Sequence, residues 1–336
     1  MRFSHRALVA IIAMFVLVAV GCGDDSSTSS TGADPGGVDS ERPTIVVTTN
    51  ILGDVVENLV GDEFDVVTIM PVGADPHDFQ ASAQQVAQIG EADVLIVNGA
   101  GFEEGLLDVI EASEADGVPV FEAISAVETI EFGEGGHDHA DEDHADEDHA
   151  DEDGHDHEGA DPHFFTDPAR MALAADAIAD FLVANVDGID VDALSASAEA
   201  YVGELESLDS EVGEMLAAID ADDRVLLTNH EVFGYFADRY DFEVVGTVIP
   251  SGSTTDGASA QALAELAELI EDEGVPAIFA DTSSSDELVQ TLASEVGDIA
   301  VVELFSESLG ADDSEGGTYL DMVRTNAQRI VDALAG

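Results

Sequence analysis

The sequence has no lysine, no tryptophan and a single cysteine among its 336 residues. Only 8 residues are lysine or arginine, against 74 aspartates and glutamates, so the formal net charge is −66. A surface of that sign repels phosphate backbones, which excludes nucleic acids as partners. A lone cysteine excludes an internal disulfide bond. The acidity is also typical of proteins adapted to a salty medium, so it does not by itself indicate a metal-binding protein.

The N-terminus has the pattern of a bacterial lipoprotein signal. Two arginines precede the apolar run Ala7–Val20, which is too short to span a membrane comfortably, and Cys22 follows after a glycine. We therefore predict a signal peptide over residues 1–22 and a lipid on Cys22. This anchor would place the protein outside the cytoplasmic membrane, at the cell surface or in the periplasm. The alternative is a plain secretory signal with an incidental cysteine. Residues 23–42, rich in Ser, Thr, Gly and Asp, are expected to form a flexible tether.

Short apolar strands alternate with helical segments through most of the remaining chain. Strands are predicted at Thr44–Thr49, Asp65–Met70, Asp93–Asn98, Pro119–Glu122, Arg224–Thr228, Glu243–Ile249, Ala277–Asp281 and Ile299–Leu304. Helices are predicted at Ile51–Val60, Ser82–Ala92, Glu104–Ala115, Val232–Tyr240, Ser259–Glu273, Asp286–Glu295 and Tyr319–Leu334. This alternation predicts parallel sheets covered on both faces, in two doubly wound α/β lobes. Ligands of such folds bind beyond the carboxyl ends of strands, so we expect a cleft between the lobes.

The middle of the chain reads as helix. Asp167 followed by a proline is a strong helix start, and apolar residues continue with helical spacing as far as Val186. A second helix is expected from about Val191 to Ile219. We predict an N-terminal lobe over residues 43–166, a linker helix over 167–190 and a C-terminal lobe over 191–336.

A low-complexity segment, Gly133–Gly159, interrupts the first lobe. The unit HADED occurs three times within it, and the segment has no apolar face, so we predict a mobile loop. Its six histidines form a candidate secondary metal site: His137, His139, His144, His149, His155 and His157. Cu²⁺ or Ni²⁺ would bind there as well as Zn²⁺. The alternative is a solvated acidic linker.

Outside this loop and the signal, the chain has only three histidines: His77, His163 and His230. The first two close the same tripeptide, in which Asp75 or Asp161 comes first and a proline lies between. Proline stiffens the backbone that presents the histidine, and the aspartate can accept the second imidazole N–H. His230 follows a predicted strand. Since neutral imidazole is the commonest zinc ligand, the three histidines are candidate metal ligands.

A cation site needs charge balance, so we look for a carboxylate at a strand end in the second lobe. Glu307 lies just past the last predicted strand, Asp281 ends the preceding strand, and Glu231 adjoins a candidate histidine. Position alone does not separate Glu307 from Asp281.

Five stretches, taken in order, resemble the zinc- and manganese-binding solute-binding proteins of ABC transporters, the ZnuA-like or TroA-like family. They are PVGADPHDF, ADPHFFTDP, LLTNHEVFGYF, IFADTSSS and TYLDMVRTNAQRIVDAL. The resemblance runs from about residue 43 to the C-terminus. It implies that His77, His163 and His230 bind the metal. LFSESLG aligns Glu307 with the fourth ligand, which is usually aspartate in the family. The resemblance also implies two lobes joined by a long rigid helix, which we expect to start at Pro168.

The function implied by this resemblance is capture of a transition metal for an ABC importer. Manganese-type members often replace the third histidine by glutamate, whereas this chain has His230, and zinc-type members often carry a His-rich loop between their first two ligands. Three imidazoles and a carboxylate also suit Zn²⁺ better than Mn²⁺. We therefore expect a monomeric Zn²⁺ receptor that serves a membrane permease and its cytoplasmic ATPase.

Three other functions stay open at this point. The chain could be a Mn²⁺ receptor, or a surface zinc buffer or adhesin that uses the loop without transport. A zinc hydrolase is the third alternative, but the sequence has no H-E-x-x-H motif and no serine or cysteine nucleophile motif. A fourth protein ligand would also close the position that a catalytic zinc keeps open. We expect no enzymatic activity.

Overall fold

The computed structural model describes residues 42–132, 159–297 and 299–335. The predicted signal peptide, the tether up to residue 41 and the lipidation site Cys22 lie outside these residues. The predicted loop lies outside them too, except for its last residue, and with it all the loop histidines: His137, His139, His144, His149, His155 and His157. No helix in the described part of the chain is long and apolar enough to cross a membrane.

The N-terminal lobe is built on a parallel sheet of four strands in the order β2-β1-β3-β4. The strands are β1 (Thr44–Val47), β2 (Asp65–Thr68), β3 (Val94–Val97) and β4 (Val120–Glu122). The connecting helices are α1 (Asn50–Val60), α2 (Ala83–Gly90) and α3 (Leu107–Ala115), with 3₁₀ turns η1 (Gly61–Glu63), η2 (Glu104–Leu106) and η3 (Ala123–Ala126). β1 and β3 are buried throughout except for the partly buried Thr44, as the apolar runs predict.

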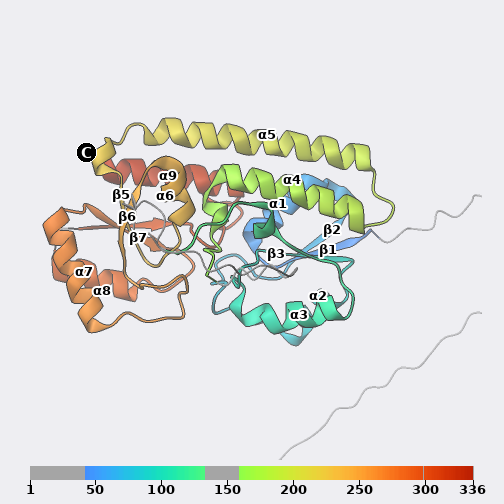
Figure 1. Cartoon of the computed structure of the whole chain (residues 1–336), viewed down its shortest axis with the longest axis horizontal. Helices are drawn as coiled ribbons and strands as arrows, with labels where there is room; N and C mark the ends of the chain where they lie inside the picture. Colours follow the sequence, from blue (N-terminus) through green and yellow to red (C-terminus); the bar gives the residue numbers. More distant parts are fainter. Residues whose placement is uncertain (1–41, 133–158, 298, 336) are drawn as a thin grey trace, which may run out of the picture. The chain divides into compact units, whose positions relative to one another are not determined.

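The C-terminal lobe repeats this order in a second parallel sheet, β6-β5-β7-β8. Its strands are β5 (Val225–Thr228), β6 (Glu243–Thr247), β7 (Ala277–Asp281) and β8 (Ala300–Leu304). Its helices are α6 (Gly234–Tyr240), α7 (Ala260–Glu273), α8 (Glu287–Val296) and α9 (Tyr319–Leu334), with a 3₁₀ turn η5 (Ala221–Asp223) before β5. Two α/β lobes with parallel sheets were predicted, and the structure confirms them (Figure 1).

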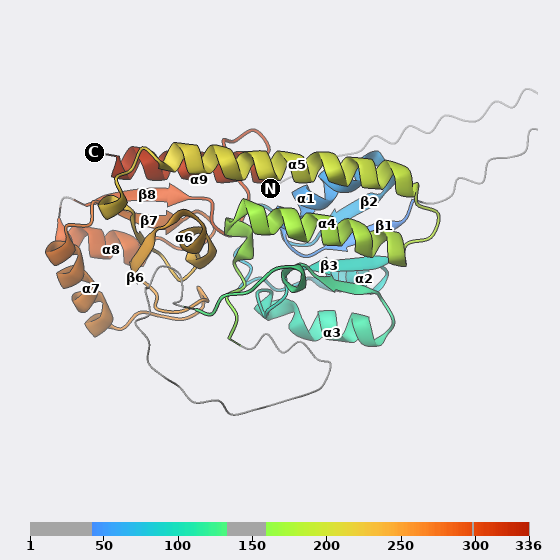
Figure 2. The ribbon, with the colours of Figure 1, turned by 45° about the horizontal axis from the view of Figure 1, so that its top comes forward.

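In the sequence, two long helices follow the strands of the first sheet and precede those of the second. A 3₁₀ turn η4 (Phe164–Thr166) leads into α4 (Pro168–Asn185), which packs against α1 and β3, and α5 (Val191–Leu216) follows. α5 contacts α1 of the first lobe and α9 of the second, and it lies beside α4 (Figure 2). Side chains from both sheets and from these helices belong to one apolar core. The division of the chain at residues 167 and 190 remains a prediction.

Local signals set the helix ends much as the sequence predicts. Asp167 accepts hydrogen bonds from the backbone N–H groups of Ala169 and Arg170 at the start of α4. Ser82 caps α2 in a reciprocal capping box with Gln85. α1 ends at Gly61, where φ is +56°, a conformation that costs glycine little.

Several predicted elements are longer than the observed ones, for local reasons. β1 stops at Val47 because Thr49 caps α1, accepting the N–H of Leu52, and the chain must leave the sheet to do so. The helix predicted from Glu104 begins instead as the 3₁₀ turn η2 and becomes α-helical at Leu107.

The strand order of each sheet reverses at one strand. β1 pairs with both β2 and β3, and β5 pairs with both β6 and β7, so the strand order reverses at β1 and at β5. In open α/β sheets, ligands bind near such a point, beyond the carboxyl ends of the strands. Each sheet therefore offers a site at that edge.

Candidate metal centre

His77 lies in the loop that follows β2. The backbone N–H of His77 donates to Oδ1 of Asp75 at 2.9 Å, which fixes the tight turn of the Asp-Pro-His tripeptide. Its side chain is almost fully buried, with Nε2 2.7 Å from Oε1 of Glu307 and Nδ1 3.1 Å from Oε1 of Glu104. Both ring nitrogens therefore face carboxylates.

His163 precedes the turn η4 and is fully buried. Oδ1 of Asp161 accepts the backbone N–H of His163 at 2.9 Å and lies 2.7 Å from its Nδ1. This contact fixes the tautomer and leaves Nε2 as the atom able to bind a metal. Tyr235 of the C-terminal lobe donates its hydroxyl to the carbonyl of Asp161, which holds the tripeptide against α6.

His230 follows β5, at the carboxyl edge of the second sheet. The hydroxyl of Thr228 donates to the carbonyl of His230 at 2.7 Å, and the side chain is fully buried. Its Nε2 lies 3.1 Å from Oε1 of Glu307. Its Nδ1 has no hydrogen-bond partner in the described part of the chain.

Glu307 follows β8 and is the point at which the three histidines meet. Its Oε1 lies 2.7 Å from Nε2 of His77, 3.3 Å from Nε2 of His163 and 3.1 Å from Nε2 of His230. One ligand atom from each of these four residues lies within 4.8 Å of the others. No other group of this kind is found among the described residues. Three nitrogens and an oxygen held this close have the composition and number of a tetrahedral zinc site.

The electrostatics follow from this shared oxygen. Burial raises the pKa of Glu307, but the charge of His230 and hydrogen bonds from the three imidazoles outweigh it and hold that pKa well below its ordinary range. Burial lowers the pKa of His77, yet the hydrogen bond and charge of Glu307 raise it overall. For His163, Asp161 and Glu307 together outweigh burial and raise the pKa to about 9. A metal that binds here must displace protons from imidazoles.

The structure brings together the three predicted histidines and Glu307, and it leaves Asp281 aside. Both oxygens of Asp281 accept hydrogen bonds from Ser283, one from its N–H and one from its hydroxyl. Burial, and then the charge of Glu307, raise the pKa of Asp281 to about 6. The carboxylate of Asp281 does not belong to the group of four ligand atoms that lie within 4.8 Å of one another. The geometry thus favours Glu307 over Asp281 as the candidate ligand, whereas their positions in the sequence did not distinguish them.

The expected role of the two aspartates is correct for Asp161 and wrong for Asp75. Asp75 does not contact the His77 ring; its Oδ2 instead accepts the hydroxyl of Thr254, from the loop after β6, at 2.6 Å. Glu104 takes its place beside the ring. The sequence gives no local signal for Glu104, because it lies 27 positions from His77 and meets it only when the loops after β2 and β3 converge.

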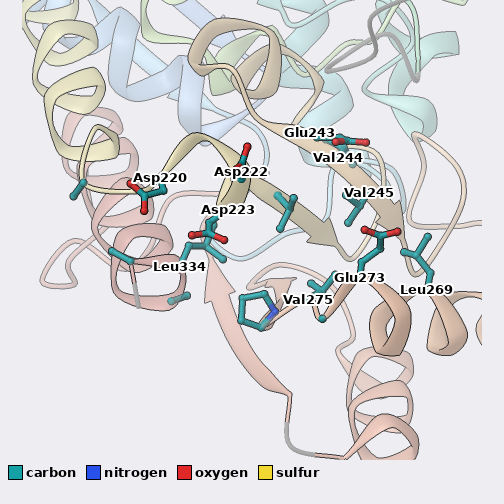
Figure 3. A pocket seen from close by; sticks show the side chains of 16 residues that line it. Asp220, Asp222, Asp223, Glu243, Val244, Val245, Leu269, Glu273, Val275 and Leu334 are labelled. Atoms are coloured by element: carbon teal, nitrogen blue, oxygen red, sulfur yellow. The ribbon is translucent and has the colours of Figure 1, made fainter.

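A separate cavity lies away from this cluster. It has a volume of about 760 Å³ and is lined by residues at the amino ends of the second sheet, including Asp223, Glu243 and Glu273 (Figure 3). The metal centre lies at the carboxyl ends of the strands, so this cavity is on the opposite edge of the sheet. It contains no histidine.

Comparison with known proteins identifies a family. The family model of the zinc-uptake complex component A, periplasmic (ZnuA) matches residues 45–333. The chain is 27% identical to the manganese-binding lipoprotein MntA of Halalkalibacterium halodurans, over 97% of each protein. It is 29% identical to the zinc-binding protein TroA of Treponema pallidum, over 88% of this chain and 89% of TroA.

Solved structures agree with this match. The periplasmic zinc-binding protein TroA from Treponema pallidum superposes with a TM-score of 0.76 at 28% identity, over 88% of this chain and all of the solved one. A crystal structure of ZnuA superposes with a TM-score of 0.70 over 87% of this chain and 99% of its own, and at 24% identity it bears on the fold alone.

Proposed function

The chain belongs to the ZnuA family of metal-receptor proteins for ABC transporters, and on that premise we propose that it captures Zn²⁺ outside the cytoplasmic membrane and delivers it to an ABC importer. The observation that carries the proposal is the convergence of three imidazole Nε2 atoms on one carboxylate oxygen of Glu307. We assign His77, His163, His230 and Glu307 as the ligands.

The donor set favours zinc over manganese. Borderline Zn²⁺ binds imidazole nitrogen readily and accepts four ligands, whereas hard Mn²⁺ prefers oxygen donors. Relatives are named for either metal: MntA for manganese and TroA for zinc. A manganese receptor is therefore the second candidate, and the test must compare both metals on the same protein.

The origin of the ligands suggests how the metal is taken up and released. His77 follows a strand of the first lobe, whereas His230 and Glu307 follow strands of the second. All four proposed ligands are at least 96% buried, so we expect the ion to enter and leave when the contacts between the lobes loosen. Separation of the lobes would divide the ligand set and weaken binding, which is what delivery to a permease requires.

Four protein ligands also argue for a receptor and against a zinc hydrolase. A catalytic zinc keeps an open position for water or substrate, and Glu307 would occupy that position here. We propose that the protein is anchored by a lipid on Cys22, at the outer side of the cytoplasmic membrane. Its proposed partners are a membrane permease and the associated ATPase, and the protein is proposed to act as a monomer.

A titration of the purified protein with Zn²⁺ and Mn²⁺ in competition with a chelator tests the proposal. We expect one tight Zn²⁺ event, weaker Mn²⁺ binding, and a loss of at least about tenfold in Zn²⁺ affinity for each of His77→Ala, His163→Ala and His230→Ala. Tighter binding of Mn²⁺ than of Zn²⁺ would favour the manganese receptor. Wild-type affinity in any of the three variants would remove that residue from the site.

A further inference from the structure

Asn50 is the first residue of α1, in the N-terminal lobe, and its side chain reaches the loop that carries Glu307. Its Oδ1 accepts the backbone N–H of Leu309 at 2.7 Å, and its Nδ2 donates to the hydroxyl oxygen of Ser308 at 3.0 Å. Asn50 is 8% exposed and Ser308 is 1% exposed, so these bonds are shielded from water. The two residues that follow Glu307 are thus held by a side chain from the other lobe.

The same amide group also contacts the loop that leads to His77. Nδ2 of Asn50 lies 3.2 Å from the carbonyl oxygen of Pro71, and the N–H of Gly73 donates to the hydroxyl oxygen of Ser308 at 2.7 Å. Asn50 and Ser308 therefore join the loop after β2 to the loop after β8. One of these loops bears His77 and the other bears Glu307.

A second asparagine fixes the start of the Glu307 loop from within its own lobe. Oδ1 of Asn326, on α9, accepts the N–H of Phe305, and its Nδ2 donates to the carbonyl of Phe305. Glu307 therefore lies between two residues whose backbones are each held by an asparagine side chain. The bonds of Asn326 to Phe305 lie within the C-terminal lobe, whereas the bond of Asn50 to Leu309 joins the two lobes.

Removal of the Asn50 amide would leave buried groups without partners. The N–H of Leu309 would lose its acceptor, and a buried backbone donor without a partner is strongly disfavoured. The loop would then shift to find water or another acceptor, and Glu307 would move with it. Since metal ligation tolerates little displacement of a donor atom, the carboxylate would no longer meet all three imidazoles.

We propose that Asn50 is a positioning residue for Glu307: it places the carboxylate against His77 when the lobes are together and so contributes to metal affinity without contacting the metal. The inference rests on the proposed function, because it takes Glu307 as a ligand. Under this proposal, a residue at the start of α1 affects metal binding although it is not a ligand.

The test is a double-mutant cycle of Asn50→Ala with Glu307→Ala, with Zn²⁺ affinity measured by chelator competition. Asn50→Ala alone should weaken binding about tenfold, the scale of losing a group that orients a ligand. In the Glu307→Ala background the same change should have an effect of less than about twofold, because the residue through which it acts is gone. Thermal unfolding of the metal-free variants reports whether each is folded.

Two further variants serve as a conservative replacement and as a control. Asn50→Asp retains the acceptor for the Leu309 N–H and should bind Zn²⁺ more tightly than Asn50→Ala. Ser306→Ala is the matched control, because Ser306 is buried in the same loop and its hydroxyl has no partner among the described residues. It should leave affinity unchanged.

Each outcome bears on a different claim. Wild-type affinity in Asn50→Ala, or an equal loss with and without Glu307, would overturn the positioning role while leaving the ligand set intact. The positioning role would also be contradicted if Asn50→Asp bound Zn²⁺ no more tightly than Asn50→Ala. Wild-type affinity in Glu307→Ala would instead overturn the ligand assignment, and the positioning role with it.

Discussion

Glu104 faces His77 on the side away from the proposed metal: its Oε1 lies 3.1 Å from Nδ1, while Nε2 of the same ring points to Glu307. The imidazole is thus held between two carboxylates. Glu104 fixes the ring orientation and the tautomer that leaves Nε2 free for a metal. Because its side chain is 39% exposed, water screens part of this effect.

Glu104→Gln should therefore weaken Zn²⁺ binding about threefold to tenfold, at or below the low end of the range for groups that orient a metal-binding histidine. Chelator competition measures the change. Asp108→Asn is the matched control, because it removes the same charge from the exposed first turn of α3. If the two variants bind Zn²⁺ with equal affinity, the loss of one negative charge accounts for the change, and orientation of the His77 ring by Glu104 does not.

Thr254 and Asp75 form another contact between the lobes, near the candidate metal centre. The Thr254 hydroxyl donates to Oδ2 of Asp75 at 2.6 Å, and Oδ1 of the same carboxylate holds the N–H of His77. Thr254→Val keeps the shape of the side chain and removes this bond, so the lobes should separate more readily. We expect Zn²⁺ to dissociate about fivefold faster, as the loss of one partly buried hydrogen bond implies.

Stopped-flow transfer of Zn²⁺ to a chelator measures that rate. Thr255→Val is the control, because among the described residues the Thr255 hydroxyl bonds only to Ser253, within its own loop. An unchanged dissociation rate in Thr254→Val would show that this contact does not hold the lobes together.

The raised pKa of His163 gives the metal-free protein a characteristic pH dependence. A histidine whose pKa rises from 6.5 to about 9 on folding stabilises the native state most below its unfolded pKa, and this contribution is lost as the pH rises through 9. The metal-free protein should therefore lose stability between about pH 7 and about pH 10, whereas Zn²⁺ affinity should increase over the same interval because binding needs neutral imidazole.

Thermal unfolding of the metal-free protein as a function of pH checks this prediction. Asp161→Asn keeps the acceptor for the His163 N–H and removes the charge that does most to raise its pKa, so the loss of stability should begin at lower pH. A wild-type stability that is flat or rises from about pH 7 to about pH 10 would contradict the ion pairs described at this site.

The segment between residues 132 and 159 should be dispensable for the tight site. Its two ends are held together, since Glu131 and Ala160 form an antiparallel bridge and the N–H of Asp161 donates to the carbonyl of Ile130. A short linker in place of residues 133–158 should leave the tight Zn²⁺ event unchanged in calorimetry. Weaker Zn²⁺ binding events on the loop histidines should disappear, because the shortened protein no longer contains those histidines. Loss of the tight event would make the loop the main site.

The helices and strands, and the histidines that meet at the candidate site, could be predicted because their signals are local. Asp167 before a proline predicts a helix start, and four-residue apolar runs predict buried strands, from sequence neighbours alone. The repeated Asp-Pro-His tripeptide similarly identifies His77 and His163 without any knowledge of the fold.

What the sequence could not predict depends on contacts between distant residues. Asn50 and Ser308 are separated by 258 positions, and nothing near either residue indicates the other. The incorrect expectation for Asp75 has the same origin: its local spacing matches that of Asp161, but the loop containing Thr254 offers it a different partner. The number of acidic residues adds to the difficulty, since 74 carboxylates leave many candidates for any ligand position.

Anomalous diffraction at the zinc edge from crystals of the zinc-loaded protein tests the assignment of the four ligands. We expect one strong peak within bonding distance of Nε2 of His77, His163 and His230 and of an oxygen of Glu307, with Zn–N distances of roughly 2.0–2.1 Å. A peak bonded to Asp281 in place of Glu307, or no peak among the three histidines, would contradict it.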